Sequence, residues 1–335
     1  MSRKPFLMAF LMVCTGFTAD FHQSAAAEET VIKIAHVSQE GVPIDRWAHK
    51  FGEILEERSG GALVVEVYPN SALGNNRELL EQLQLGALEG AISSVAFLGG
   101  FTNTTKLLDL PYLFKSNAGA EAVLDGDVGQ AMFAELEKSG FVGMCWLATG
   151  WRHLTANKEI RQPDDMNGLK IRVMDNPLHI AHFNAIGASA IPMAFSEVFT
   201  ALQQGTIDCQ ENPYANIQGS RLNEVQKYIV KTGHIYDTSP LLYSQVLWDA
   251  LPVEQQAMIR DAIVETLAWE REISSKDELQ VENRFKDNGK NVVVELTPEE
   301  RAKFRAAAQP VYDGFQGEIG SELIKKVEEI QATVQ

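Results

Sequence analysis

The sequence predicts an α/β protein of two lobes, each a mainly parallel sheet flanked by helices, together with one long helix in the C-terminal part of the chain. Two stretches, residues 31–95 and 168–213, lead to this prediction because each reads strand–helix–strand–helix–strand. Strands in this order run parallel and are joined by right-handed crossovers, so their carboxyl ends lie at one edge of the sheet. The third observation is a helical pattern from Leu251-Pro252 to about Asp287, which predicts one long helix.

The stretch from Gly168 to Pro213 predicts the second lobe. In its first strand, apolar residues alternate with Lys170 and Arg172, which is the period of a strand with one polar face. Ser196 is expected to cap the second helix and Gly205 to end it. The predicted elements are strands over 169–173, 188–191 and 207–210, a helix from Asn176-Pro177 to near Gly187, a helix from Ser196 to Gly205, and a stop at Asn212-Pro213.

Residues 31–95 are expected to build the first lobe in the same way. The predicted elements are strands over 31–37, 62–68 and 91–95, a helix from Pro43 to Glu57 ended by Gly60-Gly61, and a helix capped by Asn75 or Asn76. Each lobe should form a ligand crevice beyond its strand ends. The residues at these ends are His36, Asn76 and Ser94 in the first lobe and Arg172, Phe195 and Asn212 in the second.

The remaining segments connect the lobes. A helix over 118–138 and a strand over 141–148 should lead out of the first lobe, with Gly150 marking the crossing. Residues 234–248 are expected to return to the first lobe. After the long helix we expect a strand over 291–295, and then a capping box at Thr297-Pro298-Glu299-Glu300 that opens the last helical region.

The N-terminal residues are expected to be a signal peptide. Arg3 and Lys4 form a basic start, residues 5–17 form an apolar run, and residues 24–27 offer a cleavage site after Ala27. The run is shorter than the roughly 20 apolar residues of a spanning helix. We therefore expect an exported, periplasmic protein that does not itself span a membrane.

Composition and motifs exclude several classes of function. The formal net charge of −16 at pH 7 argues against nucleic acid and anionic lipid as partners. The chain has no G-x-S-x-G, Walker A or G-x-G-x-x-G motif, so we predict neither an enzyme nor a cofactor.

His179 and His182 have no third ligand nearby in sequence, so we expect that they lie on a solvated helix face and bind no metal. Cys145 and Cys209 could form a disulfide in an oxidising compartment or remain buried thiols.

Several long motifs carry a resemblance to a known family. GLKIRV, PMAFSEVFTALQQG and DCQENP in the second lobe are similar to motifs of the substrate-binding proteins of tripartite ATP-independent periplasmic (TRAP) transporters, the DctP family. YPNSALGNNRELLEQLQLGALEG and LPYLF upstream, and TGH downstream, extend the resemblance over nearly all of the chain after the leader. A departure is Cys209, where the family usually has glycine.

The resemblance implies a two-lobed periplasmic-binding-protein-like fold, with the long helix spanning both lobes, that closes like a hinge around its ligand. It implies a protein that captures a small organic acid and delivers it to the membrane permease of a TRAP transporter. A periplasmic sensor or scavenger of the same ligand is the alternative. The expected division is 1–27 signal peptide, 28–150 with about 235–265 first lobe, 151–234 with about 266–310 second lobe, and 311–335 a C-terminal helical segment.

Two arginines are the main candidates for the site. From spacing alone, Arg172 would be read as an exposed strand arginine, because most arginines lie at the surface. The resemblance implies the opposite: the family's motif arginine in this strand grips the substrate carboxylate, for which a guanidinium fork is well suited. Arg152, after Trp151, could contact the ligand or pair with Glu211 and His234. We hypothesise an Arg152–Glu211–His234 cluster beneath the site, because an unpaired buried arginine is costly. A purely structural role for His234 is the alternative.

The other candidates are polar or aromatic. Asn212 could donate its amide to the carboxylate or form an Asx turn before Pro213. Phe195 could pack on the ligand or seal the helix that follows. In the first lobe, Asn76 and Ser94 could bind hydroxyls, and His36, Gln39 and Arg77 are weaker candidates.

The ligand class is predicted from the first lobe. Relatives specialised for sialic acid tend to carry a glutamate near the position of Ser94, so the resemblance makes that substrate less expected. The polar set favours a sugar acid such as a hexuronate or aldonate. A C4-dicarboxylate is the alternative, with Arg77 or Arg152 as the second cation.

Overall fold

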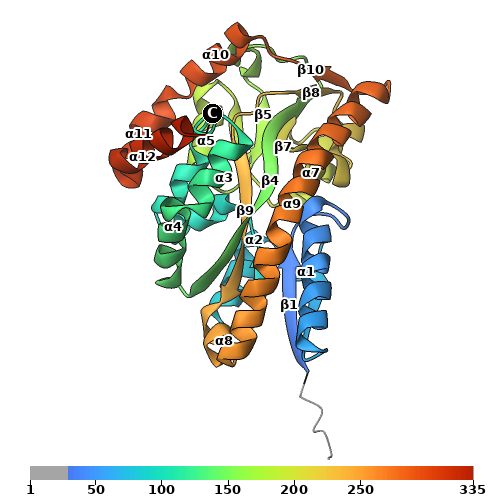
Figure 1. The fold of residues 1–335 in the computed structure, drawn as a ribbon. Coiled ribbons are helices and arrows are strands. Elements are labelled where there is room, and N and C mark those ends of the chain that lie inside the picture. The colour runs from blue at the N-terminus through green and yellow to red at the C-terminus, as the bar shows by residue number, and fades with distance from the viewer. Residues whose placement is uncertain (1–28, 335) are drawn as a thin grey trace, which may run out of the picture.

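The computed structural model describes residues 29–334 and has the two-lobed α/β architecture predicted from the sequence (Figure 1). The first lobe begins with β1 (Thr30–His36), α1 (Pro43–Ser59), β2 (Leu63–Tyr68), α2 (Asn76–Gln84) and β3 (Gly90–Ile92). β1 lies between β2 and β3 and pairs in parallel with both, as the crossover order requires. Asn75 caps α2 in a capping box with Glu78, and Gly60 ends α1 in the left-handed conformation.

The chain then covers the first lobe with short helices before it crosses. These are the 3₁₀ helices η1 (Val95–Gly100) and η2 (Thr104–Asp109), followed by α3 (Asn117–Asp125) and α4 (Asp127–Glu137). The single helix predicted over 118–138 is therefore wrong. Gly126 takes an extended conformation and divides this segment into two helices. A Cβ at this position would lie 2.9 Å from the backbone oxygen of Ala122, a close approach that glycine permits.

One long strand connects the lobes. β4 (Phe141–Ala156) continues well past the predicted end at residue 148. Its first part pairs antiparallel with β9 (Tyr236–Ser244) up to Trp151, and from Arg152 it pairs antiparallel with β7 (Cys209–Pro213). β9 also pairs with β3, so residues 234–248 return the chain to the first lobe as predicted. Arg152 thus occupies the position at which β4 changes partner.

The second lobe repeats the parallel arrangement. Its elements are η3 (Pro163–Met166), β5 (Lys170–Val173), α5 (Pro177–Ala185), β6 (Ser189–Pro192), η4 (Phe195–Glu197), α6 (Val198–Gln203), α7 (Tyr214–Gly219), η5 (Leu222–Glu224) and β8 (Tyr228–Val230) in addition to β7. β5 pairs in parallel with β6 and β7. The carboxyl ends of these strands therefore face the first lobe across the β4 crossing.

Two local predictions for this lobe are wrong. Ser196 does not cap α6, because it lies inside the 3₁₀ turn η4 that leads into the helix. The last strand does not stop at Asn212-Pro213 but includes both residues. Pro213 is tolerated there because the strand ends at this residue and α7 begins at the next.

The last quarter of the chain packs against both lobes. α8 (Gln245–Ala250) is followed by α9 (Val253–Asp287), a helix of 35 residues that runs diagonally across both lobes in Figure 1. β10 (Val292–Val294) pairs with β8, and Thr297 caps α10 (Pro298–Ala307) in the predicted capping box. α11 (Gln309–Ile319) and α12 (Ser321–Ala332) contribute Val311, Ile319 and Val327 to an apolar core that also contains first-lobe residues such as Leu79 and Leu98.

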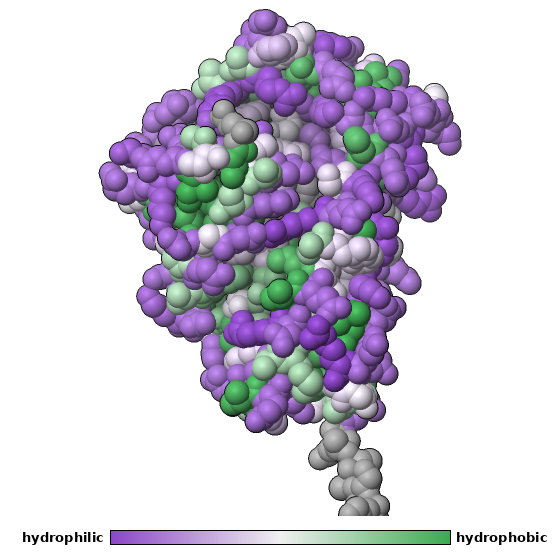
Figure 2. Space-filling model, viewed as in Figure 1, coloured by the Kyte–Doolittle hydropathy of each residue, from purple (hydrophilic) through white to green (hydrophobic). Residues whose placement is uncertain are grey.

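The strands form one sheet through the whole molecule, in the order β2-β1-β3-β9-β4-β7-β5-β6, with β8 attached to β4. Hydrophilic side chains cover most of the face seen in Figure 2. No helix within residues 29–334 is both long and apolar enough to cross a membrane.

Cys145 and Cys209 are buried free thiols, so of the two alternatives left open by the sequence, a disulfide or free thiols, the structure has the second. The predicted signal peptide and its cleavage site lie outside the described residues.

Gly150 allows a test of whether β4 needs a positive φ where it crosses between the lobes. It lies in β4 at φ +102, where the pairing with β9 shifts register. A Cβ there would meet only ordinary contacts, with Glu278 Oε2 at 3.6 Å, so the cost of a side chain is in the backbone. Gly150→Ala should lower the free energy of unfolding by about 1–3 kcal/mol. The measurement is urea unfolding followed by circular dichroism.

The matched control is Gly314→Ala. Gly314 lies within α11, and a Cβ added there would meet no atom within 4 Å, so alanine should be neutral or stabilising by up to ~1 kcal/mol. Equal stability of the Gly150→Ala and wild-type proteins would show that the crossing does not require a positive φ.

Candidate functional site

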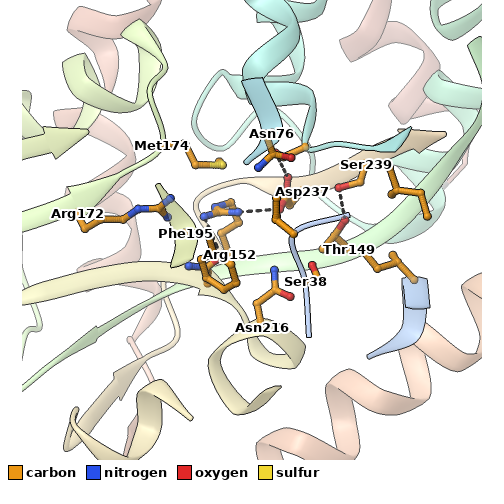
Figure 3. Close-up of a pocket in the computed structure, with 15 residues that line it drawn as sticks. Ser38, Asn76, Thr149, Arg152, Arg172, Met174, Phe195, Asn216, Asp237 and Ser239 are labelled. Carbon is orange, nitrogen blue, oxygen red and sulfur yellow. Dashed lines mark hydrogen bonds and ion pairs between the residues drawn. The ribbon is translucent and has the colours of Figure 1, made fainter. Parts of the chain in front are cut away.

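A cavity lies where the strand ends of the two lobes face each other beside the β4 crossing. Its lining residues are Val37, Ser38, Ile44, Asn76, Ile92 and Ser94 from the first lobe, Thr149, Arg152, Asp237 and Ser239 from the crossing strands, and Arg172, Met174, Phe195, Asn212 and Asn216 from the second lobe. In Figure 3, Arg172 and Arg152 reach toward the same central space, with Asn76 above it and Asn216 below. The open volume is about 30 Å³, which holds little more than a water molecule.

Arg172 is a buried cation that has no counter-ion in the part of the chain that the structure describes. It lies on β5 with 1% of its surface exposed, and its Nε and Nη2 both donate to the carbonyl oxygen of Met193, at 3.0 and 2.8 Å. A guanidinium has five N–H donors, so three remain without an acceptor among residues 29–334. Burial is the main reason that the pKa of Arg172 falls to about 10. The free Nη1–Nη2 edge matches a carboxylate with two parallel hydrogen bonds.

Arg152, in contrast, is fully matched by carboxylates. Its Nε and Nη2 donate to the two carboxylate oxygens of Glu211, at 2.5 and 2.8 Å, and Nη1 donates to Asp237 Oδ2 at 2.7 Å. Nη2 also lies 2.8 Å from the backbone oxygen of Glu211 and 3.3 Å from Asn212 Oδ1. One N–H of Nη1 is left for a ligand. Burial alone would raise the pKa of Glu211, but Arg152, His179 and His234 hold it well below its usual range.

His234 joins this cluster, so the geometry of the hypothesised Arg152–Glu211–His234 group is present. His234 Nε2 lies 3.0 Å from Glu211 Oε2, and His234 Nδ1 lies 2.8 Å from Thr232 Oγ1. Burial lowers the pKa of His234, so the imidazole is neutral. It can then donate from Nε2 to Glu211 and accept the hydroxyl of Thr232 at Nδ1.

His179 links the cluster to the first-lobe segment η2. Its Nε2 lies 3.0 Å from Asp109 Oδ1, and its Nδ1 lies 3.8 Å from Glu211 Oε1. Burial alone would lower the pKa of His179, but Asp109 and Glu211 raise it to about 9. The expectation that His179 and His182 lie on a solvated helix face is wrong, because both are buried. Within the described part of the chain, no group of histidine, cysteine or carboxylate residues could hold a metal ion.

The other second-lobe candidates also line the cavity. Asn212 donates from Nδ2 to Gln210 Oε1 at 2.6 Å, so its side chain is held within β7 and does not form an Asx turn. Its second amide N–H has no acceptor among the described residues. The ring of Phe195 lies 5.8 Å from the guanidinium carbon of Arg172, a cation–π distance. Trp151 lies outside the cavity and donates from Nε1 to Asn117 Oδ1 at 2.7 Å.

The first-lobe candidates divide into two groups. Asn76 and Ser94 line the cavity: Asn76 Oδ1 accepts from Ser93 Oγ at 3.0 Å, and Ser94 Oγ donates to Asp237 Oδ1 at 3.1 Å. His36 is buried outside the cavity lining with Nε2 3.2 Å from Asp45 Oδ1. Arg77 is exposed outside it and donates to Asp175 Oδ2 at 2.7 Å, which joins α2 to the turn before α5.

Sequence reasoning missed several lining residues. The most consequential is Asp237, a buried carboxylate in β9 that faces the cavity between Arg152 and Ser94. An aspartate within a predicted strand is a signal that could have identified it, because aspartate is rarely buried unless it is paired. Asn216 on α7 and Ser38 after β1 were also missed, and their side chains make no hydrogen bond with the described residues. Gln39 lies against Gly219 and not in the cavity.

The arrangement is suited to holding an organic anion. Arg172 offers an unneutralised fork, and amide and hydroxyl groups of both lobes surround it. Glu211 and Asp237 both pair with Arg152, so among the described residues Arg172 is the cavity-lining cation that has no carboxylate partner.

Comparison with known proteins identifies related chains. Residues 34–318 match the family model of the bacterial extracellular solute-binding proteins, family 7 (DctP). A solute-binding protein of Verminephrobacter eiseniae is 37% identical to this chain over 92% of this chain and 91% of its own length.

Two solved structures resemble the fold over both lobes. A TRAP periplasmic solute-binding protein from Shewanella oneidensis, with bound succinate, aligns with a TM-score of 0.88 at 31% identity and covers 90% of this chain and 99% of its own. The sugar acid binding protein DctPAm from Advenella mimigardefordensis, in complex with galactonate, aligns with a TM-score of 0.89 at 30% identity and covers 92% and 99%.

The raised pKa of His179 predicts a specific pH dependence of stability. Because its folded pKa of about 9 lies above the unfolded value of 6.5, the stabilisation is fully present below pH 6.5 and is lost as the pH rises through 9. The shift corresponds to roughly 3 kcal/mol. We expect the free energy of unfolding, measured in urea between pH 6.5 and 9.5, to fall in wild type by more than in His179→Gln.

His49→Gln is the control, because the His49 side chain is 57% exposed. Its pH dependence should follow that of wild type. The same slope in His179→Gln and wild type would mean that His179 is not charged in the folded protein.

Proposed function

The chain belongs to family 7 of the bacterial extracellular solute-binding proteins, the DctP family of TRAP transporters, and we propose that it captures a small organic acid for a TRAP membrane permease. This family consists of solute-binding proteins and not of enzymes. The observation that supports the proposal most directly is Arg172, a buried guanidinium with no counter-ion among the described residues and with a free edge that opens into the interlobe cavity. A ligand carboxylate completes its hydrogen bonds and removes the cost of an unpaired buried charge.

We propose that the acid is a sugar acid, with a C4-dicarboxylate as the second candidate. Opposite Arg172 the cavity offers hydroxyls and amides, including those of Ser38, Asn76 and Ser239, together with the carboxylate of Asp237. A carboxylate accepts hydrogen bonds from ligand hydroxyls but repels a second ligand carboxylate. Arg152, the second cation available for a dicarboxylate, is already neutralised by Glu211 and Asp237. Arg77 lies outside the cavity.

We propose that the lobes separate to admit the acid and close on it. The support is the small open volume, about 30 Å³, together with contacts that join the lobes around the cavity. Asn176 at the start of α5 donates to the Ala96 oxygen at 2.7 Å and to Asp109 Oδ2 at 2.9 Å, and Arg77 bridges to Asp175. In this proposal the lobes comprise 28–150 with about 235–265, and 151–234 with about 266–310; residues 311–335 form a C-terminal helical segment.

In this proposal the protein works in the periplasm, exported by a signal peptide that is cleaved after about Ala27. The closed form then docks on the permease. The family model, which describes extracellular solute-binding proteins, supports the location. The TRAP class of the related structures supports docking on a permease.

The proposed function is tested by substituting Arg172 and measuring ligand binding. Purified protein is titrated by calorimetry with a panel of sugar acids and dicarboxylates, each beside its neutral analogue. Arg172→Ala should weaken binding of the preferred acid several hundred-fold or more, because removing one partner of a buried charge pair costs roughly 3–5 kcal/mol. Arg172→Lys should stay impaired, because an ammonium lacks the fork.

Lys170→Ala is the matched control, since Lys170 lies on the same strand but is exposed. It should bind like wild type. Affinity within a few-fold of wild type in Arg172→Ala, or tight binding of the neutral analogues, would refute the carboxylate clamp.

The choice between ligand classes is tested with Asp237→Asn. The amide keeps the shape of the side chain but removes the negative charge that faces a second carboxylate. The ratio of dicarboxylate to sugar-acid affinity should rise at least ~10-fold, equivalent to about 1.4 kcal/mol. The ratio is compared because a general loss of affinity in Asp237→Asn would lower the affinities for both ligand classes and leave their ratio unchanged. An unchanged ratio would remove Asp237 as the source of selectivity.

A further inference from the structure

A second cavity lies on the other side of the β4 crossing. Side chains alternate across a strand, so Trp151 and His153 point away from the face that Arg152 uses. Both line a cavity of about 400 Å³ that does not share a lining residue with the ligand cavity. The segment before α3, the β8–β9 connection, α9 and α10 complete its walls. In Figure 1, α3, α9 and α10 lie around the part of the sheet where β4 crosses.

This cavity collects cations from three separate segments: Lys115 before α3, Lys231 after β8, and Arg301 and Arg305 on α10. Lys231 is paired with Glu282 at 2.7 Å. The other three have no carboxylate within ion-pair distance among the described residues; Arg301 donates to the backbone oxygen of Thr232 at 3.0 Å. In a protein with a formal charge of −16, three converging cations without counter-ions leave a local excess of positive charge.

The cavity contains one acidic lining residue, Glu278, on α9. Its carboxylate is not paired with any of the cations. Burial raises its pKa to about 7, so it neutralises the cations only in part at neutral pH. Aromatic rings of Trp151, Tyr112 and Phe114 form the remaining wall. A concave site of this size is in the range of small-molecule pockets rather than of a protein-docking surface.

We propose that this cavity is an anion site for a phosphate-type dianion, bound by the guanidinium groups of Arg301 and Arg305 and the ammonium group of Lys115. Guanidinium groups match phosphate oxygens with paired hydrogen bonds, and lysine adds a point charge. The dianion would lie between the segment before α3 and α10, so it would connect chain segments that are far apart in the sequence, at residues 115 and 301–305. The site is separate from Arg172 and its proposed ligand.

The test uses inorganic phosphate and the fluorescence of Trp151, which lines the cavity. Phosphate added to the full mature chain in a phosphate-free buffer should change the emission saturably, and the change should be absent in Trp151→Phe. The dissociation constant should be unchanged in Arg172→Ala, which separates this site from the organic-acid site. Arg305→Gln should weaken binding at least ~10-fold; Arg305 is exposed, so the substitution should not disturb folding.

Lys303→Gln is the matched control, because Lys303 lies on the same helix with the same charge but outside the cavity. It should bind phosphate like wild type. The proposal is overturned if calorimetry finds no saturable binding up to tens of millimolar phosphate. It is also overturned if Arg305→Gln and Lys303→Gln weaken binding equally, or if Arg172→Ala abolishes it.

Discussion

The structure depends most on the pairing of one buried cation, Arg152, at the point where β4 passes from β9 to β7. Pairing a buried arginine with carboxylates is strongly favourable, because an unpaired charge in the interior costs several kcal/mol. Here Glu211 from β7 and Asp237 from β9 supply them, each from the strand that pairs with β4 on one side of the crossing. The pairing therefore fixes both lobes to the same position on β4 and at the same time builds the base of the cavity.

This pairing also explains how a protein with a net charge of −16 can bind an acid. Because Arg152 is neutralised locally, the positive charge available to a ligand comes from Arg172, whose side chain is held by the Met193 carbonyl and not by a carboxylate. A neutral oxygen orients the guanidinium without cancelling its charge. The attraction is therefore confined to one edge of one side chain, which favours recognition of a single carboxylate together with hydrogen-bonding groups over binding of anions in general.

Much of the fold could be predicted from the sequence, because its signals are local. Strand period, the Asn75 and Thr297 caps, and the Gly60 stop all depend on residues close in the chain, and the structure confirms them. The failures concern places where tertiary context outweighs local pattern. Gly126 breaks a helix whose apolar spacing continues, and β4 extends beyond residue 148 because β7 offers it a second pairing edge.

The same distinction explains which cavity residues could be found. Arg172, Phe195 and Asn212 lie in contiguous motifs, so a resemblance points to them directly. Asp237 and Asn216 lie in segments where the sequence shows only a polar residue with no motif around it, and their proximity to Arg172 arises from the antiparallel return of β9 and from α7. Specificity is therefore harder to predict than class: the carboxylate-binding arginine is encoded within one strand, whereas the groups that select among acids come from segments that only the folded sheet brings together.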